Sequence, residues 1–148
     1  MPHVPLSQAL IGTWRLLSRE DRTASGEQRI DPGLGADPIA LLVYDRGGHF
    51  AAQFMKRDRR SVPVAAGPST PNNSQAVGGY DAYFGSYTVD DSAGTVTQRL
   101  VGALSAENVG LVLTRSMRVS GDELVIQLET ASADGTRVVR TLRWARAA

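Results

Sequence analysis

The stretch GLVLTRSMRVSGDELVIQLETASADGTRVVRTLRWAR, residues 110–146, decides the fold class. Apolar and polar residues alternate along 110–120, 122–130 and 136–146, and this period of two is typical of β-strands with one buried face. The short connections SGD and ADG suit tight turns, because Gly and Asp accept the backbone angles that hairpins require. The stretch therefore predicts three antiparallel strands joined in chain order.

The same alternation occurs in the rest of the chain. Short strands that follow one another through hairpins form a meander, and a meander removes its exposed edges by closing into a barrel. We therefore expect one domain, residues 1–148, folded as an all-β, antiparallel up-and-down β-barrel of about eight to ten strands. The additional strands are expected at 11–20, 27–31, 38–45, 49–56, 86–91 and 94–104.

Residues 59–79 interrupt this pattern and are rich in Pro, Gly, Ser and Asn. Thr70 is a suitable helix N-cap, and Pro71 is favoured at the first helical position. Apolar residues then recur at three- and four-residue spacing, as on one face of a helix. The segment predicts a loop and one short helix that caps a mouth of the barrel, either as a structural plug or as a lid. The helical stripe consists of Ala76, Val77, Tyr80, Tyr83 and Phe84.

Composition excludes several classes of protein. A net charge of +1 and a hydrophobic content of 42% predict a globular chain with no nucleic-acid or membrane partner. The chain has no cysteine and two histidines, so we expect no disulfide, no metal site and no thiol chemistry. No Gly-rich phosphate loop opens a helix, and no cofactor is expected. With no signal-peptide pattern and no apolar run of about 20 residues, a cytoplasmic location is expected.

Alternation also places polar residues on faces that are otherwise apolar. Arg115 is the one charge on the inner face of 110–120, and Gln98 shares its face with Val96 and Leu100. A buried guanidinium is costly unless it is paired or hydrogen-bonded. Arg115 is therefore expected either to form an ion pair inside the barrel or to meet an anionic oxygen of a ligand. The apolar residues on the same face are Leu111, Leu113, Met117 and Val119.

The hairpin around the turn DRGG (45–48) has two candidate inner faces. We expect Tyr44 to lie opposite His49, and alternation then puts Gln53 on the same face. The other face is strongly apolar, so either face could line the interior. We favour the face of Tyr44, His49 and Gln53, because its small alanines leave room and its polar groups can converge on a ligand. A solvent-facing or hydrogen-bonded core His49 is the alternative.

The segment GTWRLLS (12–18) carries a Gly-x-Trp signature, and four later segments follow it in order: LLVYDRGGHFAAQFMKRDR, YDAYFGSYTVDDSAGTVTQRLVG, GLVLTRSMRVSGDELVI and RTLRWAR. With these segments the chain resembles the bacterial lipocalin-like domain family. The resemblance implies a β-barrel with an internal cavity for a small hydrophobic molecule. It also implies that Trp14 closes the barrel floor against an arginine of the last strand, which would be Arg140 or Arg143.

Some β-barrel proteins similar to this family are cyclases or isomerases of polyketide or related specialised metabolism. The resemblance thus implies a cofactor-free cyclase or isomerase as one hypothesis, and a non-catalytic carrier of a small hydrophobic ligand as the other. In the first hypothesis His49 is the general acid or base, and Arg115 and Tyr44 complete the catalytic set. Apolar outer faces further suggest a homodimer. The expected ligand contacts are Gln53, Gln98, Tyr83, Tyr87, Met55, Met117 and Leu113.

Overall fold

The computed structural model describes residues 3–61 and 76–147. Their strands form one antiparallel sheet, and the predicted count of about eight to ten strands is confirmed by nine. None of the helices in these ranges is long and apolar enough to cross a membrane. The strands are β1 (Gly12–Arg22), β2 (Gln28–Arg29), β3 (Ile39–Tyr44), β4 (His49–Met55), β5 (Tyr80–Asp90), β6 (Thr95–Ala103), β7 (Val112–Ser120), β8 (Glu123–Ala131) and β9 (Arg137–Arg146). The helical turns are α1 (Leu6–Ala9), η1 (Arg59–Ser61) and η2 (Ala106–Asn108).

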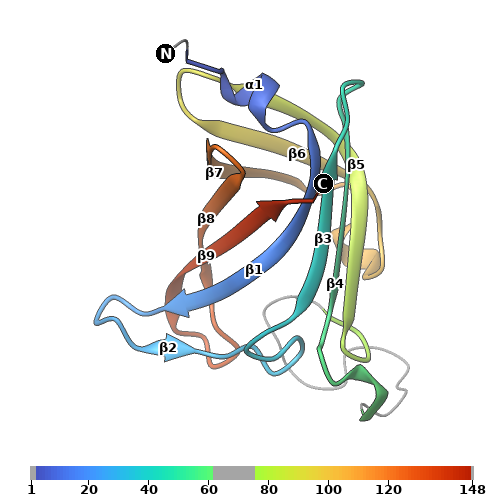
Figure 1. Cartoon of the computed structure of the whole chain (residues 1–148). Coiled ribbons are helices and arrows are strands. Elements are labelled where there is room, and N and C mark those ends of the chain that lie inside the picture. The colour runs from blue at the N-terminus through green and yellow to red at the C-terminus, as the bar shows by residue number, and fades with distance from the viewer. Residues whose placement is uncertain (1–2, 62–75, 148) are drawn as a thin grey trace.

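The sheet closes on itself, as Figure 1 shows. Strands β3 to β9 pair in chain order, β1 pairs with β3 on one side, and β9 returns to β1 on the other. The closing ladder includes Trp14 opposite Arg146 and Leu16 opposite Trp144. The short β2 pairs only with the end of β1. The predicted up-and-down barrel is therefore confirmed, as eight closed strands and one extra strand.

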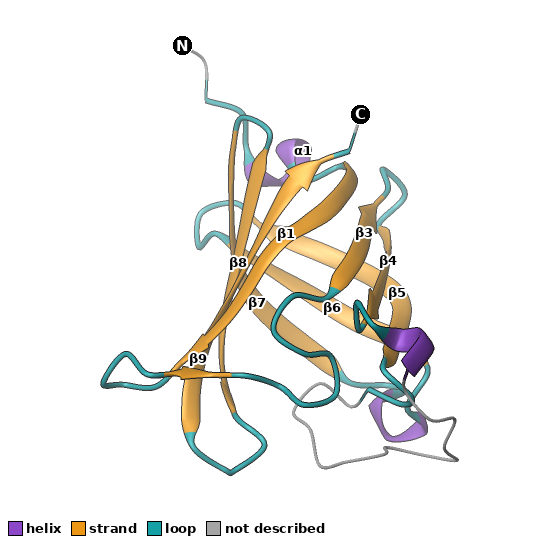
Figure 2. Cartoon of the chain, turned by 60° about the horizontal axis from the view of Figure 1, so that its bottom comes forward, coloured by secondary structure: helices purple, strands orange, loops and turns teal. Residues whose placement is uncertain are grey.

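One end of the barrel is covered by α1, which lies beside the start of β1 (Figures 1 and 2). Leu10 and Trp14 are fully buried there, and the Trp14 indole Nε1 donates to the Leu10 carbonyl at 2.9 Å. Ser7 donates to the Asp91 carboxylate from both its backbone N–H and its hydroxyl, at 2.7 Å each. These bonds hold α1 against the turn between β5 and β6. This end is the floor of the barrel.

The helix predicted over residues 76–84 is wrong, because Tyr80–Asp90 is strand β5 and the preceding residues 76–79 form a turn closed by a bridge between Val77 and Tyr80. Asp81 and Tyr83 point inward while Phe84 is exposed. Asp81 is polar although it occupies an inner position of the strand, so it breaks the expected alternation of apolar and polar residues. The remaining apolar residues then fit the three- and four-residue spacing of a helix. Thr70 and Pro71 lie outside the described residues. The short helix that caps an end is α1 instead.

The predicted pairing of the β3–β4 hairpin is wrong by one residue. Tyr44 pairs with Phe50, not His49. His49 begins β4 opposite Asp45, whose backbone N–H donates to the His49 carbonyl at 2.9 Å and whose side chain accepts the His49 N–H at 2.8 Å. Because side chains alternate along a strand, a shift of one residue moves every side chain of β4 to the other face. Phe50 is consequently buried inside, and His49 and Gln53 lie on the outer surface.

Two glycines of the β5–β6 pair should differ sharply in their tolerance of alanine. At Gly85, next to a β-bulge, an added Cβ would lie 1.8 Å from the Arg99 carbonyl oxygen, which belongs to the neighbouring strand. At Gly102 the added Cβ would meet only the Phe84 ring, which is exposed and can rotate away. We expect Gly85→Ala to cost about 1–3 kcal/mol or more of unfolding free energy, and Gly102→Ala less than about 1 kcal/mol. Urea denaturation measures both, and equal losses would contradict the prediction.

Candidate functional site

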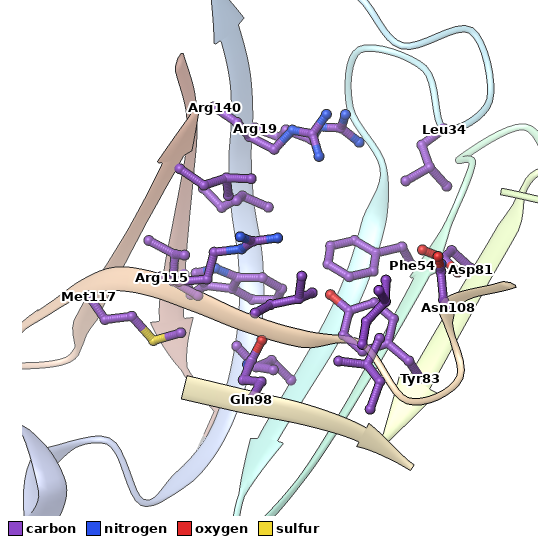
Figure 3. Close-up of a pocket in the computed structure, with 18 of the residues that line it drawn as sticks. Arg19, Leu34, Phe54, Asp81, Tyr83, Gln98, Asn108, Arg115, Met117 and Arg140 are labelled. Carbon is purple, nitrogen blue, oxygen red and sulfur yellow. The ribbon is translucent and has the colours of Figure 1, made fainter. Parts of the chain in front are cut away.

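The barrel contains a cavity of about 220 Å³, and its lining includes residues of β1 and of β3 to β9. Its walls are mainly apolar, and Figure 3 shows their side chains converging from several strands. An apolar cavity of roughly 150 Å³ is large enough for benzene, so this one can hold a compact molecule of one or two rings. The apolar walls include Leu42, Phe54, Leu100, Leu113, Met117 and Ile126.

A hydrogen-bonded group lies at the deep end of the cavity. Gln98 donates from Nε2 to the Tyr44 hydroxyl at 2.6 Å, and that hydroxyl contacts the Met117 sulfur at 3.7 Å. Burial raises the pKa of Tyr44, and the nearby Tyr83 raises it further. Tyr44 is thus held neutral, and its hydroxyl already has partners within the wall.

Arg115 projects into the same cavity from β7. In the described part of the chain Arg115 forms no ion pair, and its guanidinium makes one long hydrogen bond there, 3.5 Å from Nη1 to the Thr114 carbonyl. Burial lowers the pKa of Arg115, while Tyr83 and Tyr44 act in the opposite direction. The predicted internal ion pair is therefore wrong for the described residues, and the fork of the guanidinium faces the cavity.

Two further polar groups reach the cavity from adjacent inner positions of β5. The Asp81 side chain is buried, and its Oδ1 has no hydrogen-bond partner in the described structure. Burial raises the pKa of Asp81 to about 6, an effect that the backbone N–H of Ala82 and the charge of Arg19 partly oppose. Tyr83 has its pKa raised to about 12 by burial and by Asp81. Asp81 was missed because residues 80–84 were interpreted as a helix; a strand would have placed it beside Tyr83.

A buried ion-pair network forms one side of the cavity mouth. Arg140 donates to both carboxylate oxygens of Asp21, at 3.0 and 3.2 Å, and Arg19 lies 3.4 Å from Asp21 and 3.5 Å from Asp31. Asp31 also accepts from the Gly33 N–H and so fixes the loop between β2 and β3. Since both arginines already have carboxylate partners, we assign this network to the stability of the rim.

The floor contains the stacked pair that the Gly-x-Trp signature implied, with a different arginine. The Arg146 guanidinium carbon lies 4.3 Å from the centre of the Trp14 ring, and its Nη atoms donate to the carbonyls of Ile11 and Ala9. The expectation of Arg140 or Arg143 is wrong because the β1–β9 register sets Trp14 directly opposite Arg146.

A comparison with protein families agrees with this architecture. The model of a lipocalin-like domain family matches residues 11–147, which is nearly the whole chain. The chain belongs to this lipocalin-like family. Among curated proteins, no match was found. A lipocalin-like barrel suggests the binding of small hydrophobic ligands, and the cavity of this lipocalin-like protein has suitable walls.

The structure brings six of the predicted site residues into the cavity wall of the lipocalin-like barrel. They come from β3, β5, β6 and β7, and alternation along each strand accounts for their direction. Their contact with a ligand stays a prediction. The six are Tyr44, Tyr83, Gln98, Leu113, Arg115 and Met117.

The remaining four predicted residues lie elsewhere. The His49 side chain is 71% exposed on the outer surface, with Nδ1 3.4 Å from the Asp45 carboxylate. Gln53, also on the outer face, accepts a hydrogen bond from the Tyr80 hydroxyl, and Met55 shares that face. Tyr87 packs edge-on against Tyr44, and its hydroxyl donates to the Asp45 carbonyl at 2.6 Å, outside the cavity lining.

Metal binding has no obvious location in this lipocalin-like protein. Across residues 3–61 and 76–147, no three His, Asp or Glu side chains gather in a way that could hold an ion. The lining of the cavity includes three guanidinium groups, two phenols, two amides and one carboxyl group. These groups can bind an oxygen atom and transfer a proton.

Proposed function

We propose that this lipocalin-like protein binds, inside its barrel, a small and mainly apolar molecule that carries one anionic or strongly accepting oxygen. The observation that carries the proposal is the Arg115 guanidinium, which faces an apolar cavity without an ion-pair partner among the described residues. A charge in such surroundings is costly unless it is paired. A ligand oxygen would supply the missing partner.

Size and polarity define the ligand further. A cavity of about 220 Å³ favours one or two rings over a long lipid chain. The Tyr83 hydroxyl has no hydrogen-bond partner in the part of the chain that the structure describes, and it can donate to the same oxygen as Arg115. Carboxylates, phenolates and enolates combine such an oxygen with an apolar body. A carrier and an enzyme would both need to bind an oxygen of this kind together with its apolar body.

The cyclase or isomerase of polyketide-type metabolism is the finer form of this proposal. It needs an acid or base that reaches the ligand, and His49, whose side chain is on the outer surface, does not line the cavity. A non-catalytic carrier needs no such acid or base. A homodimer and a cytoplasmic location stay predictions, which sedimentation analysis and cell fractionation would check.

Replacing Arg115 with Met tests the binding proposal. The probe is 2-naphthol, a bicyclic molecule with one acidic hydroxyl, followed by its fluorescence. A charge-assisted hydrogen bond contributes about 1.5–3 kcal/mol, so Arg115→Met should weaken binding roughly 10- to 100-fold. The matched control is Arg118→Met, on the outer face of the same strand. Control and wild type should bind equally, and so should His49→Ala.

Two results would contradict the proposal. One is equal affinity of wild type and Arg115→Met for 2-naphthol. The other is the absence of any saturable binding to the wild type. 2-Methoxynaphthalene cannot ionise, so the wild type should prefer 2-naphthol to it, and Arg115→Met should lose most of that preference.

A further inference from the structure

We infer that Asp81 is a general base in this cavity and that the protein isomerises a small enolisable carbonyl compound by moving a proton between two of its carbons. The inference rests on the proposed function, because Arg115 must first hold the carbonyl oxygen. Asp81 would then be a catalytic residue, and the substrate class would be a one- or two-ring ketone or ester with an acidic C–H bond.

The position of Asp81 is the first argument. Its side chain is 5% exposed and lines the cavity, and Oδ1 has no partner among the described residues. The buried carboxylate of Asp21, by contrast, is bonded through both oxygens to Arg140. Leaving a buried carboxylate oxygen without a partner costs stability, so such a group calls for an explanation. A role of Asp81 as the acceptor of a proton from a ligand supplies that explanation.

The groups around Asp81 are the second argument. Figure 3 shows the Tyr83 hydroxyl between the Asp81 carboxyl and the Arg115 guanidinium, with all three facing the cavity. A carbonyl oxygen held by Arg115 and Tyr83 would therefore direct the rest of a compact molecule toward Asp81. Donors aimed at an oxygen that gains negative charge stabilise the transition state. The cavity thus places a base on one side and oxyanion donors on the other.

The proposed reaction balances without a further reactant. The Asp81 carboxylate takes a proton from the carbon next to the carbonyl group, so that the C–H bond breaks and an O–H bond forms on Asp81. The electron pair moves toward the carbonyl oxygen, and the resulting enolate is held by Arg115 and Tyr83. The substrate carries a C=C bond next to the deprotonated carbon, and Asp81 returns the proton to the far carbon of that bond, so that the double bond moves into conjugation with the carbonyl group. The net change is a shifted double bond.

The charge state of Asp81 fits this role. With its pKa raised to about 6 by burial, Asp81 is mostly ionised at neutral pH and is a stronger base than an ordinary aspartate. Arg19 on β1 and Asp31 in the β2–β3 loop act on the charge of Asp81, Tyr83 lies two residues along β5, and Arg115 on β7 and Arg140 on β9 line the same cavity. Tyr83, with a pKa of about 12, does not titrate near neutrality.

The experiment measures proton abstraction directly. The full chain is incubated with 2-tetralone, a bicyclic ketone with an activated C–H bond, in D₂O, and ¹H NMR follows the loss of that proton signal. We expect the wild type to exceed the buffer rate and Asp81→Asn to lose at least about 100-fold of the enzymatic rate. The control is Glu129→Gln, an exposed carboxylate on the outer face of β8, which should exchange like the wild type.

Binding of 2-naphthol separates the inference from the proposed function. Asp81→Asn should bind 2-naphthol within about threefold of the wild type, because Arg115 is unchanged. Intact 2-naphthol binding, together with either exchange at the buffer rate in the wild type or full exchange in Asp81→Asn, would overturn the inference and leave the binding function standing. Failure of the wild type to bind 2-naphthol would overturn both.

The pH profile and protein stability give two further readouts. The exchange rate should rise as the pH passes about 6 and then level off, because the carboxylate form is the base. A raised folded-state pKa also means that ionised Asp81 destabilises the folded protein as the pH rises from about 4 to about 6. Asp81→Asn should therefore unfold at higher urea than the wild type above pH 6. A flat exchange profile would contradict the inference.

Discussion

Replacing Asp21 with Ala is expected to lower the free energy of unfolding by about 3–5 kcal/mol. Asp21 is 3% exposed and lies between two guanidinium groups, those of Arg19 and Arg140. Burial already lowers the pKa of Arg19, and the charge of Arg140 lowers it further, which shows that the two cations repel each other. Without Asp21, Arg140 loses its bidentate partner, and Arg19 keeps the longer contact to Asp31.

Glu20 provides the matched control for this experiment. It is the neighbouring residue on β1, faces outward, and forms an ion pair with Arg22 in which both side chains are about half exposed. Exposed ion pairs contribute about 0–1 kcal/mol, so Glu20→Ala should have a small effect. Urea denaturation at neutral pH measures both variants. An Asp21→Ala protein within about 1 kcal/mol of the wild type would show that the rim network adds little to stability.

Replacing Trp14 with Ala is expected to cost about 3–5 kcal/mol, the range for truncating large buried aromatic side chains. Trp14 is fully buried, donates to the Leu10 carbonyl and lies under the Arg146 guanidinium. The variant therefore loses apolar burial, a hydrogen bond and a cation–π contact together. It also removes the side chain that holds α1 on the barrel, so the floor should open to water.

Leu17 is a suitable control for Trp14, because it lies on the same strand and is 47% exposed. Leu17→Ala should change stability by less than about 1 kcal/mol. Where Trp14→Ala does not fold, Trp14→Phe keeps an aromatic ring and should show a smaller loss. Thermal or urea unfolding gives the values, and near-equal stability of Trp14→Ala and Leu17→Ala would contradict the assigned role of the floor.

The stability losses expected at Asp21 and Trp14 separate the groups that stabilise the barrel from the cavity groups that we propose bind a ligand. The floor and the rim network hold the barrel closed through buried partners that satisfy one another. In the described structure Arg115 has no ion-pair partner, and Oδ1 of Asp81 has no hydrogen-bond partner. Substituting the first set should therefore cost stability, whereas Asp81→Asn should cost activity and add stability. This contrast distinguishes structural polar groups from functional ones.

The sequence by itself determined most of the strands, their antiparallel order and, within each of those strands, which residues share a face. The period of two and the Gly- and Asp-containing turns are local properties, so they identified β7, β8 and β9 and the inward direction of Arg115 and Gln98. Arg115 was singled out because a charge on an apolar stripe is visible in one strand alone. The Gly-x-Trp segment likewise indicated a floor around Trp14.

Tertiary structure alone decided the register and the partners. In the β3–β4 hairpin Tyr44 pairs with Phe50, one residue beyond the predicted partner, and this register places His49 on the outer surface, because a shift of one residue reverses the faces of a strand. Barrel closure paired Asp21 with Arg140, which lies 119 residues away, and left Oδ1 of the buried Asp81 without a hydrogen-bond partner among the described residues. Alternation tells which residues share a face, but only closure tells which face is inside and which distant groups meet there.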